Sequence, residues 1–105
     1  MAAIIEKIAK TPILIKQESE IRDGKVIWGG DISALAFVMG FTQSDIGLYG
    51  TVQNGKIFLV APTVRVPKLP AIILCNGETF DIKAIKPYRN TKNVLLGYRI
   101  AAVGA

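Results

Sequence analysis

Apolar and polar residues alternate along several short segments of the chain, a spacing typical of β-strands that bury one face. In residues 79–84 this alternation predicts an inner face of Phe80, Ile82 and Ala84. Residues 13–16 alternate in the same way before the chain becomes polar, as in a strand that runs out into solvent. The pattern therefore predicts a mostly β protein.

Three dipeptides suited to tight turns divide these segments: Asp23-Gly24, Asn54-Gly55 and Asn76-Gly77. Each supplies residues that tolerate positive φ, as a type I′ hairpin turn requires. The middle turn would join a strand at residues 46–53 to one at 56–62. With a final apolar run at residues 94–103, the turns predict six to eight antiparallel strands in a small β-barrel or sandwich.

One short helix is expected at the N-terminus, over Ala2–Ala9. Ile4, Ile5 and Ile8 recur at helical spacing, and Pro12 prevents the helix from continuing. A helix of about two turns is marginal alone, so it must pack against the rest of the protein.

Two regions break the regular pattern. Residues 62–70 contain three prolines, which exclude a central strand and predict a connector or an exposed arm. Residues 29–50 are rich in glycine and are expected to be irregular. Within them, Ala34–Met39 is either a buried strand or an apolar loop that reaches another chain.

The 105 residues suffice for a single domain, yet half of them are hydrophobic and the mean hydropathy is +0.38. A small domain cannot bury so much apolar surface alone, so part of it is expected to meet a partner. Trp28 is either a core residue near a strand end or an interface anchor. The full set of interface candidates is Trp28, Leu35, Phe37, Met39, Phe41, Arg65 and Lys68.

Charge is unevenly distributed along the chain: residues 1–52 sum to −1 and residues 53–105 to +6. After Asp81 every charged side chain is positive. Such a cluster suits non-specific contact with DNA phosphates, and Tyr88 could stack on a base. Solubility, or contact with an acidic partner, is the alternative. The candidates for a DNA-facing surface are Lys83, Lys86, Arg89 and Lys92.

No residue pattern argues for catalysis, and we expect neither an enzyme nor a cofactor. The chain has no histidine and one cysteine, which exclude a histidine-dependent triad and a cysteine-rich zinc site. Cys75 is expected to be a buried hydrophobic residue. No phosphate-binding glycine motif occurs, and no apolar run is long enough to cross a membrane.

About half of the chain resembles the head-tail joining, or head-closure, proteins of tailed bacteriophages. The resemblance lies in Thr11–Lys16 followed by Asp23–Gly30 with its Trp28, and in Asn76–Pro87 followed by Leu95–Ile100. It implies a small β-barrel that forms a homo-oligomeric ring between portal and tail. The virion would then be its location, after assembly in the host cytoplasm.

Other functions stay open at this point. The chain could be a tail-completion or decoration protein of the virion. It could also be a nucleic-acid-binding barrel of the oligonucleotide-binding or SH3-like kind. An enzyme that uses surface carboxylates is the third class.

Overall fold

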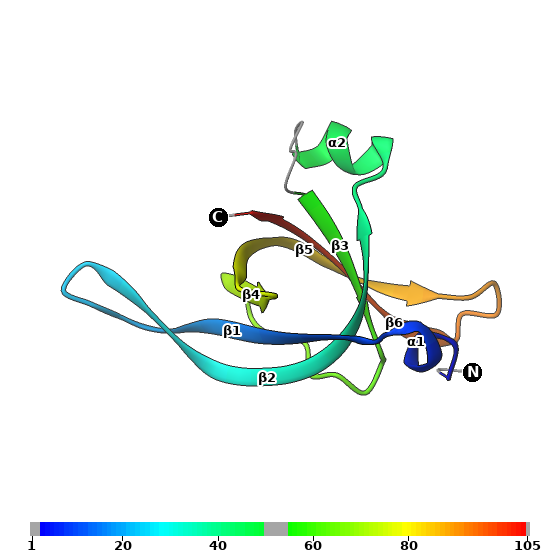
Figure 1. Ribbon diagram of the computed structural model, residues 1–105, viewed down its shortest axis with the longest axis horizontal. Coiled ribbons are helices and arrows are strands. Elements are labelled where there is room, and N and C mark those ends of the chain that lie inside the picture. Colours follow the sequence, from blue (N-terminus) through cyan, green and yellow to red (C-terminus); the bar gives the residue numbers. More distant parts are fainter. Residues whose placement is uncertain (1–2, 50–54, 105) are drawn as a thin grey trace.

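A computed structural model describes residues 3–49 and 55–104 of the chain (Figure 1). The six strands form a closed antiparallel barrel in the order β1-β2-β3-β6-β5-β4, which confirms the predicted fold class. The elements are α1 (Ala3–Ile8), β1 (Thr11–Arg22), β2 (Lys25–Gly40), α2 (Gln43–Tyr49), β3 (Gly55–Val60), β4 (Ala71–Cys75), β5 (Glu78–Arg89) and β6 (Leu95–Gly104).

The barrel interior is filled by one apolar side chain from every second position of each strand. Phe58 of β3 and Phe80 of β5 meet edge to face in the core, with ring centroids 5.4 Å apart. Ile100 and Ala102 of β6 are buried in the same core. The largest other members of this core are Ile13, Ile15, Ile32, Val60, Ile73 and Ile82.

Two of the three predicted turns form hairpins. Asp23 and Gly24 have φ of 52° and 75°, and Asn76 and Gly77 have φ of 52° and 80°. Positive φ at both central residues is the signature of the predicted type I′ turn, whose twist matches that of the flanking strands. Asn54, of the third dipeptide, lies outside the described residues, and Gly55 begins β3.

The segment before β3 differs from the prediction of a strand at residues 46–53, because residues 46–49 belong to helix α2. Residues 50–53 of that predicted strand lie outside the described residues. Thr42 and Asp45 cap the helix reciprocally: the Asp45 N–H donates to Thr42 Oγ1, and the Thr42 N–H donates to Asp45 Oδ2. These bonds satisfy N–H groups that a helix start leaves without partners. This local cap outweighs the weak strand character of an isoleucine, a leucine and a tyrosine.

Residues 29–50 are also more regular than predicted. β2 is one continuous strand from Lys25 to Gly40, and Ala34, Ala36 and Val38 point into the barrel. The glycines Gly29 and Gly30 are accommodated within the strand at a register shift opposite Lys16. Of the two interpretations of Ala34–Met39, the strand is therefore correct, but it is buried on one face only, since Leu35 and Phe37 are exposed.

The inner face of β5 changes within the strand. Ile82 pairs with Ala102, but a bulge follows, so that Ala84 pairs with Ala101 and Ile85 with Ile100. Ile85 therefore packs on the core, and the prediction that Ala84 points inward is wrong. An extra residue in one strand reverses the alternation beyond it, and a pattern of apolar residues does not reveal this by itself.

The proline-rich segment connects β3 to β4 outside the sheet, as predicted. It does not extend away from the protein, since Val64 packs on the core and Pro67 is buried. The backbone N–H of Lys68 donates to Oε1 of Gln17 at 2.9 Å, which holds the segment against β1. The segment thus covers one end of the barrel.

Strands β1 and β2 are much longer than their other neighbours. Only Leu14 to Gln17 of β1 pair with β4, and only Ala36 to Gly40 of β2 pair with β3. Residues 17–30 therefore project as a two-stranded hairpin, here called the arm, which Figure 1 shows extending to the left of the barrel. The arm accounts for much of the 47 Å length of a molecule only 29 and 25 Å across.

We predict that Gly97→Ala destabilises the protein by about 1–3 kcal/mol, the usual cost of overpacking. A methyl group at Gly97 would collide with the carbonyl oxygen of Val60 and lie 2.6 Å from Ile5 Cδ1. The Val60 oxygen belongs to the backbone of β3, so it cannot move without disturbing the β3–β6 pairing that closes the barrel.

Urea denaturation measures this effect, and Gly40→Ala is the matched control. Gly40 is also a strand residue, but a methyl group there would meet nothing within 4 Å. We expect its free energy of unfolding to change by less than about 0.5 kcal/mol. Equal losses in the two variants would show that steric contact at Gly97 is not the cause.

Candidate interaction surfaces

Three predicted interface residues share one exposed strip on the outside of the barrel. Leu35, Phe37 and Met39 of β2 point outward, because the residues between them point into the core. Leu35 is 52% exposed and Phe37 is 39% exposed, while Met39 is half-buried. We call these three residues the outer strip. Aliphatic and aromatic side chains this exposed on a regular strand are typical of a surface that meets a partner.

Phe41 does not belong to the outer strip. It follows the end of β2, and a methyl group at Gly55 would lie 2.5 Å from its ring. Phe41 therefore packs directly over the first residue of β3, which has no side chain to obstruct the ring. Phe41 thus has a packing role within the chain, and its place in an interface stays a prediction.

Trp28 lies in the arm, where it pairs with Glu18, and it is half-buried. It is not a core residue, so the first of its two interpretations is wrong. Cross-strand partners share a face, and Val26 pairs with Ile21 two positions further along. Ile21, Val26 and Trp28 therefore form one apolar face of the arm, with Ile21 67% exposed and Val26 40% exposed.

Arg65 and Lys68, also predicted at an interface, lie beside the base of the arm with exposed side chains. Arg65 Nη2 donates to the carbonyl oxygen of Gly30 at 3.3 Å. Together with the bond from Lys68 to Gln17, this contact links the proline-rich connector between β3 and β4, here called the 61–70 segment, to both strands of the arm. The two residues thus orient the arm within the chain, and their charges face solvent.

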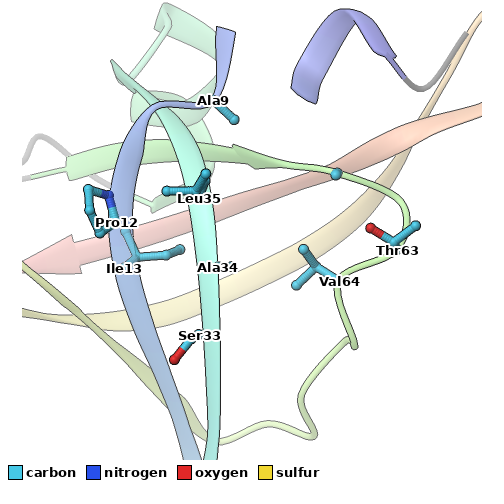
Figure 2. Close-up of a pocket in the computed structure, with 9 residues that line it drawn as sticks. Ala9, Pro12, Ile13, Ser33, Ala34, Leu35, Thr63 and Val64 are labelled. Carbon is cyan, nitrogen blue, oxygen red and sulfur yellow. The ribbon is translucent and has the colours of Figure 1, made fainter. Parts of the chain in front are cut away.

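A groove opens in the barrel wall between β2 and the start of the 61–70 segment. Its volume is about 600 Å³. Figure 2 shows Ile13, Ala34 and Leu35 on one side and Thr63 and Val64 on the other. The groove forms because β2 has no strand partner on this side before Ala36. No periodicity in the sequence signals it, since its two walls are about 30 residues apart.

The basic residues lie on the hairpin of β5 and β6, residues 83–99, here called the basic hairpin. Lys83, Lys86, Arg89 and Lys92 are all exposed, and so is Tyr88 at 44%. Side-chain bonds order the hairpin end: Asn90 Oδ1 accepts from the N–H groups of Lys92 and Val94 at 2.9 and 3.0 Å. Lys83 sits at the bulge of β5, further from this end than the other three.

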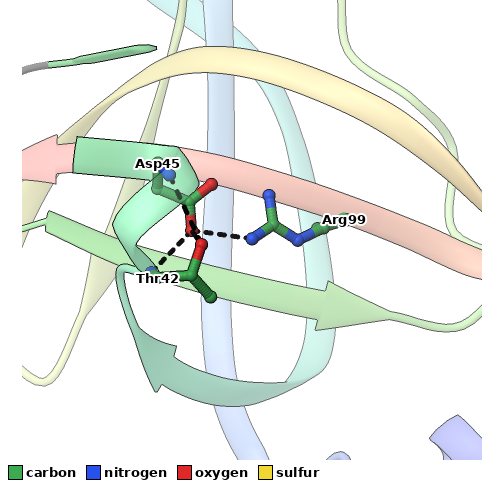
Figure 3. Close-up of polar contacts among 3 residues, drawn as sticks. All are labelled: Thr42, Asp45 and Arg99. Atoms are coloured by element: carbon green, nitrogen blue, oxygen red, sulfur yellow. Dashed lines mark hydrogen bonds and ion pairs between the residues drawn. The ribbon is translucent and has the colours of Figure 1, made fainter. Parts of the chain in front are cut away.

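Among the side chains that the structure describes, which do not include those of residues 3, 4, 6 and 49, one buried charged group occurs, the carboxylate of Asp45 (Figure 3). Its Oδ2 accepts three bonds: from Arg99 Nη2 at 2.7 Å, and from the N–H and the hydroxyl of Thr42 at 2.8 Å each. Arg99 lies on the outward face of β6, so this ion pair holds α2 against the outside of the barrel.

The bond from Arg99 lowers the pKa of Asp45 to about 2 from its ordinary value of 3.8; burial opposes this, and the two bonds from Thr42 add to it. The arrangement stabilises a carboxylate and leaves it no basicity near neutral pH, so it suits structure better than proton transfer. The Thr42-x-x-Asp45 spacing was the signal in the sequence that could have found the helix and its cap.

Cys75 is buried, as predicted, and burial together with the negative charge of Glu78 raises the pKa of its thiol. In the described part of the chain, no three histidine, cysteine, aspartate or glutamate residues gather closely enough to hold a metal ion. None of the helices in these residues has the length and apolar character needed to span a membrane.

Comparison of the chain with protein-family models, curated proteins and solved structures identifies no match. The residues that carry the resemblance to head-closure proteins fold as β1, the arm, the β4–β5 turn and the strands β5 and β6. The features of the molecule that bear on its function are therefore the outer strip, the arm, the groove and the basic hairpin.

We predict that Asp45→Asn lowers the free energy of unfolding at pH 7 by about 2 kcal/mol. This is the linkage value of a pKa shift from 3.8 to about 2. The stabilisation from the carboxylate is complete above pH 4 and is lost as the pH falls towards 2. In the variant, this part of the acid-induced loss of stability should be absent.

Urea denaturation between pH 2 and pH 7 measures both effects. Asp31→Asn is the matched control, because Asp31 pairs with Lys16 at 3.7 Å on the surface, where its side chain is 55% exposed. A surface pair of this kind contributes less than about 1 kcal/mol. If the two variants had the same pH profile, the buried ion pair would not be the source of the pH dependence.

Proposed function

We propose that the protein is a structural assembly subunit that forms a homo-oligomeric ring joining head and tail in a tailed phage or prophage virion. The proposal combines the resemblance in Thr11–Lys16, Asp23–Gly30, Asn76–Pro87 and Leu95–Ile100 with the surfaces of the barrel. Its partners would be further copies of itself and the portal or tail proteins of the virion, and it requires neither a cofactor nor a membrane.

The observation that carries the proposal is the exposure of ordered apolar strand residues in the single chain. Leu35 and Phe37 on β2, and Ile21 and Val26 on the arm, belong to regular strands, yet the described part of the chain leaves 39–67% of each exposed. Burying such side chains gains about 25 cal/mol per Å² of apolar surface, which favours association. A permanent subunit of an assembly tolerates this exposure because its neighbours cover it.

The basic hairpin favours contact with nucleic acid as a second role. Lys86, Arg89 and Lys92 project at one end of the molecule together with an exposed tyrosine, and no acidic residue follows Asp81. Around a channel, this surface would attract DNA by long-range, salt-screened forces without sequence preference. A small nucleic-acid-binding barrel outside a virion is the alternative function, and a tail-completion or decoration protein is the alternative within it.

The proposal predicts that the purified protein forms a closed oligomer, and that Leu35→Ser weakens it by about tenfold or more. Native mass spectrometry gives the mass and copy number, and electron microscopy shows whether the oligomer is a ring. Leu69→Ser is the matched control, since Leu69 is 49% exposed against 52% for Leu35 but lies in the 61–70 segment. A monomer at all concentrations, with no association with virion particles, would contradict the proposal.

Changing Lys86, Arg89 and Lys92 together to glutamate tests the role of the basic hairpin. All three are exposed, so the fold should be unchanged. We expect the wild-type chain to bind single- or double-stranded DNA weakly, with affinity that falls steeply with salt, and the variant to lose this binding. In a particle, the variant should assemble but retain the genome poorly. Rings that fail to form would instead show that the hairpin contacts a neighbouring subunit.

A further inference from the structure

The groove between β2 and the 61–70 segment lies where the edge of β2 has no neighbouring strand. Residues 25–35 of β2 have no strand partner on the β3 side among the described residues, and the groove lies along residues 33–35 of this edge. Its lining is mainly apolar and includes Ala9, Pro12, Ile13, Ala34, Leu35 and Val64. Open strand edges with apolar flanks are the usual sites at which an extended segment adds to a sheet.

The arm has the shape and chemistry of such a segment. One of its faces carries Ile21, Val26 and Trp28, with Glu18 beside Trp28, whereas the opposite face carries Glu20 beside Ile27 and the pair Arg22 and Lys25. A two-stranded hairpin with no surface to pack on is at best marginally stable in water. The face with three apolar side chains is therefore the one that a partner would cover.

The arm of one copy does not reach the groove of the same copy. Figure 1 shows the arm at one end of the long axis and α1 at the other, and Ala9, directly after α1, lines the groove. The two surfaces can therefore meet only between copies. Such a contact joins unlike surfaces and repeats from copy to copy, so it generates a ring where the rotation closes.

The charges beside the two surfaces are complementary. The arm carries Glu18, Glu20 and Asp23 against Arg22 and Lys25, which sums to −1. Ala9, which lines the groove, lies in the sequence between Lys7 and Lys10, whose side chains are exposed. Opposite charges at the edges of an apolar contact favour one orientation of the partner over others.

We propose that the arm docks through Ile21, Val26 and Trp28 in the groove of a second copy of this chain, beside Lys7 and Lys10 of that copy. This contact rests on the proposed function, because it is the interface that would link subunits around the ring. It deepens that function by naming which two surfaces meet and by making the interface head-to-tail.

Two neighbouring residues of the arm allow a matched test. Val26 and Ile27 are 40% and 38% exposed and lie on opposite faces of the same strand. Val26→Lys puts a charge into the apolar groove, close to Lys7 and Lys10, and should weaken assembly by about tenfold or more in native mass spectrometry. Ile27→Lys adds the same charge beside Glu20 and should leave assembly within about twofold of wild type. Equal effects would overturn the proposal.

Cysteine cross-linking identifies the contact directly. Chains with Val26→Cys are mixed with chains with Leu35→Cys and oxidised; a disulfide between the two requires Cα atoms within about 7 Å. We expect this mixed dimer, and no cross-link when Val94→Cys replaces Val26→Cys. The wild-type thiol Cys75 is buried and provides the background.

The outcomes separate this inference from the proposed function. If the wild-type chain assembles but Val26→Lys assembles equally well and no mixed disulfide forms, the arm–groove contact is wrong and ring formation stands. A disulfide only between two Val26→Cys chains would show two-fold pairing of arms and also overturn the contact. A wild-type chain that is monomeric at every concentration would overturn both.

Discussion

Pairing of β3 with β6 closes the sheet, and the rest of the structure depends on this closure. The two strands are in register from Gly55 with Val103 to Val60 with Tyr98, over the length of β3. Closure brings Phe58 of β3 into the core, where its ring meets that of Phe80. It also brings Gly97 so close to the backbone of Val60 that only a glycine fits.

Because β3 and β4 are short, a barrel closed through them cannot occupy the full length of the other strands. β1 and β2 continue beyond it as the arm, and β5 and β6 continue as the basic hairpin. Figure 1 shows these two extensions on opposite sides of the barrel. The closed barrel is thus a rigid base from which two chemically different surfaces project, one with an apolar face and one basic.

The ion pair between Asp45 and Arg99 attaches helix α2 to the outside of the barrel. A helix of seven residues has little stability of its own, so α2 depends on its cap at Thr42 and on its bond to β6. The bond between Arg99 and the buried carboxylate of Asp45 stabilises the position of α2 only while that carboxylate is charged. Protonation of Asp45 in acid therefore weakens this part of the fold.

Local rules of the sequence determined the fold class, two of the turns and part of the core. Asp23-Gly24 and Asn76-Gly77 specify tight turns by their tolerance of positive φ, and alternation assigns Phe80 and Ile82 to the inner face of β5. Each of these features depends on residues a few positions apart. The helix α2 was equally local, in its Thr42-x-x-Asp45 cap, but its apolar residues resemble those of a strand.

Only the tertiary structure decided the features that join distant residues. The bulge of β5 turns Ala84 to the face opposite the one that alternation predicts, and the alternation of apolar residues does not show where an extra residue is inserted. The groove joins β2 to a segment about 30 residues later, and the arm is exposed because β3 and β4 end before it begins. The sequence names the apolar residues; which of them stay uncovered depends on the unequal lengths of paired strands, a property that appears only when the barrel closes.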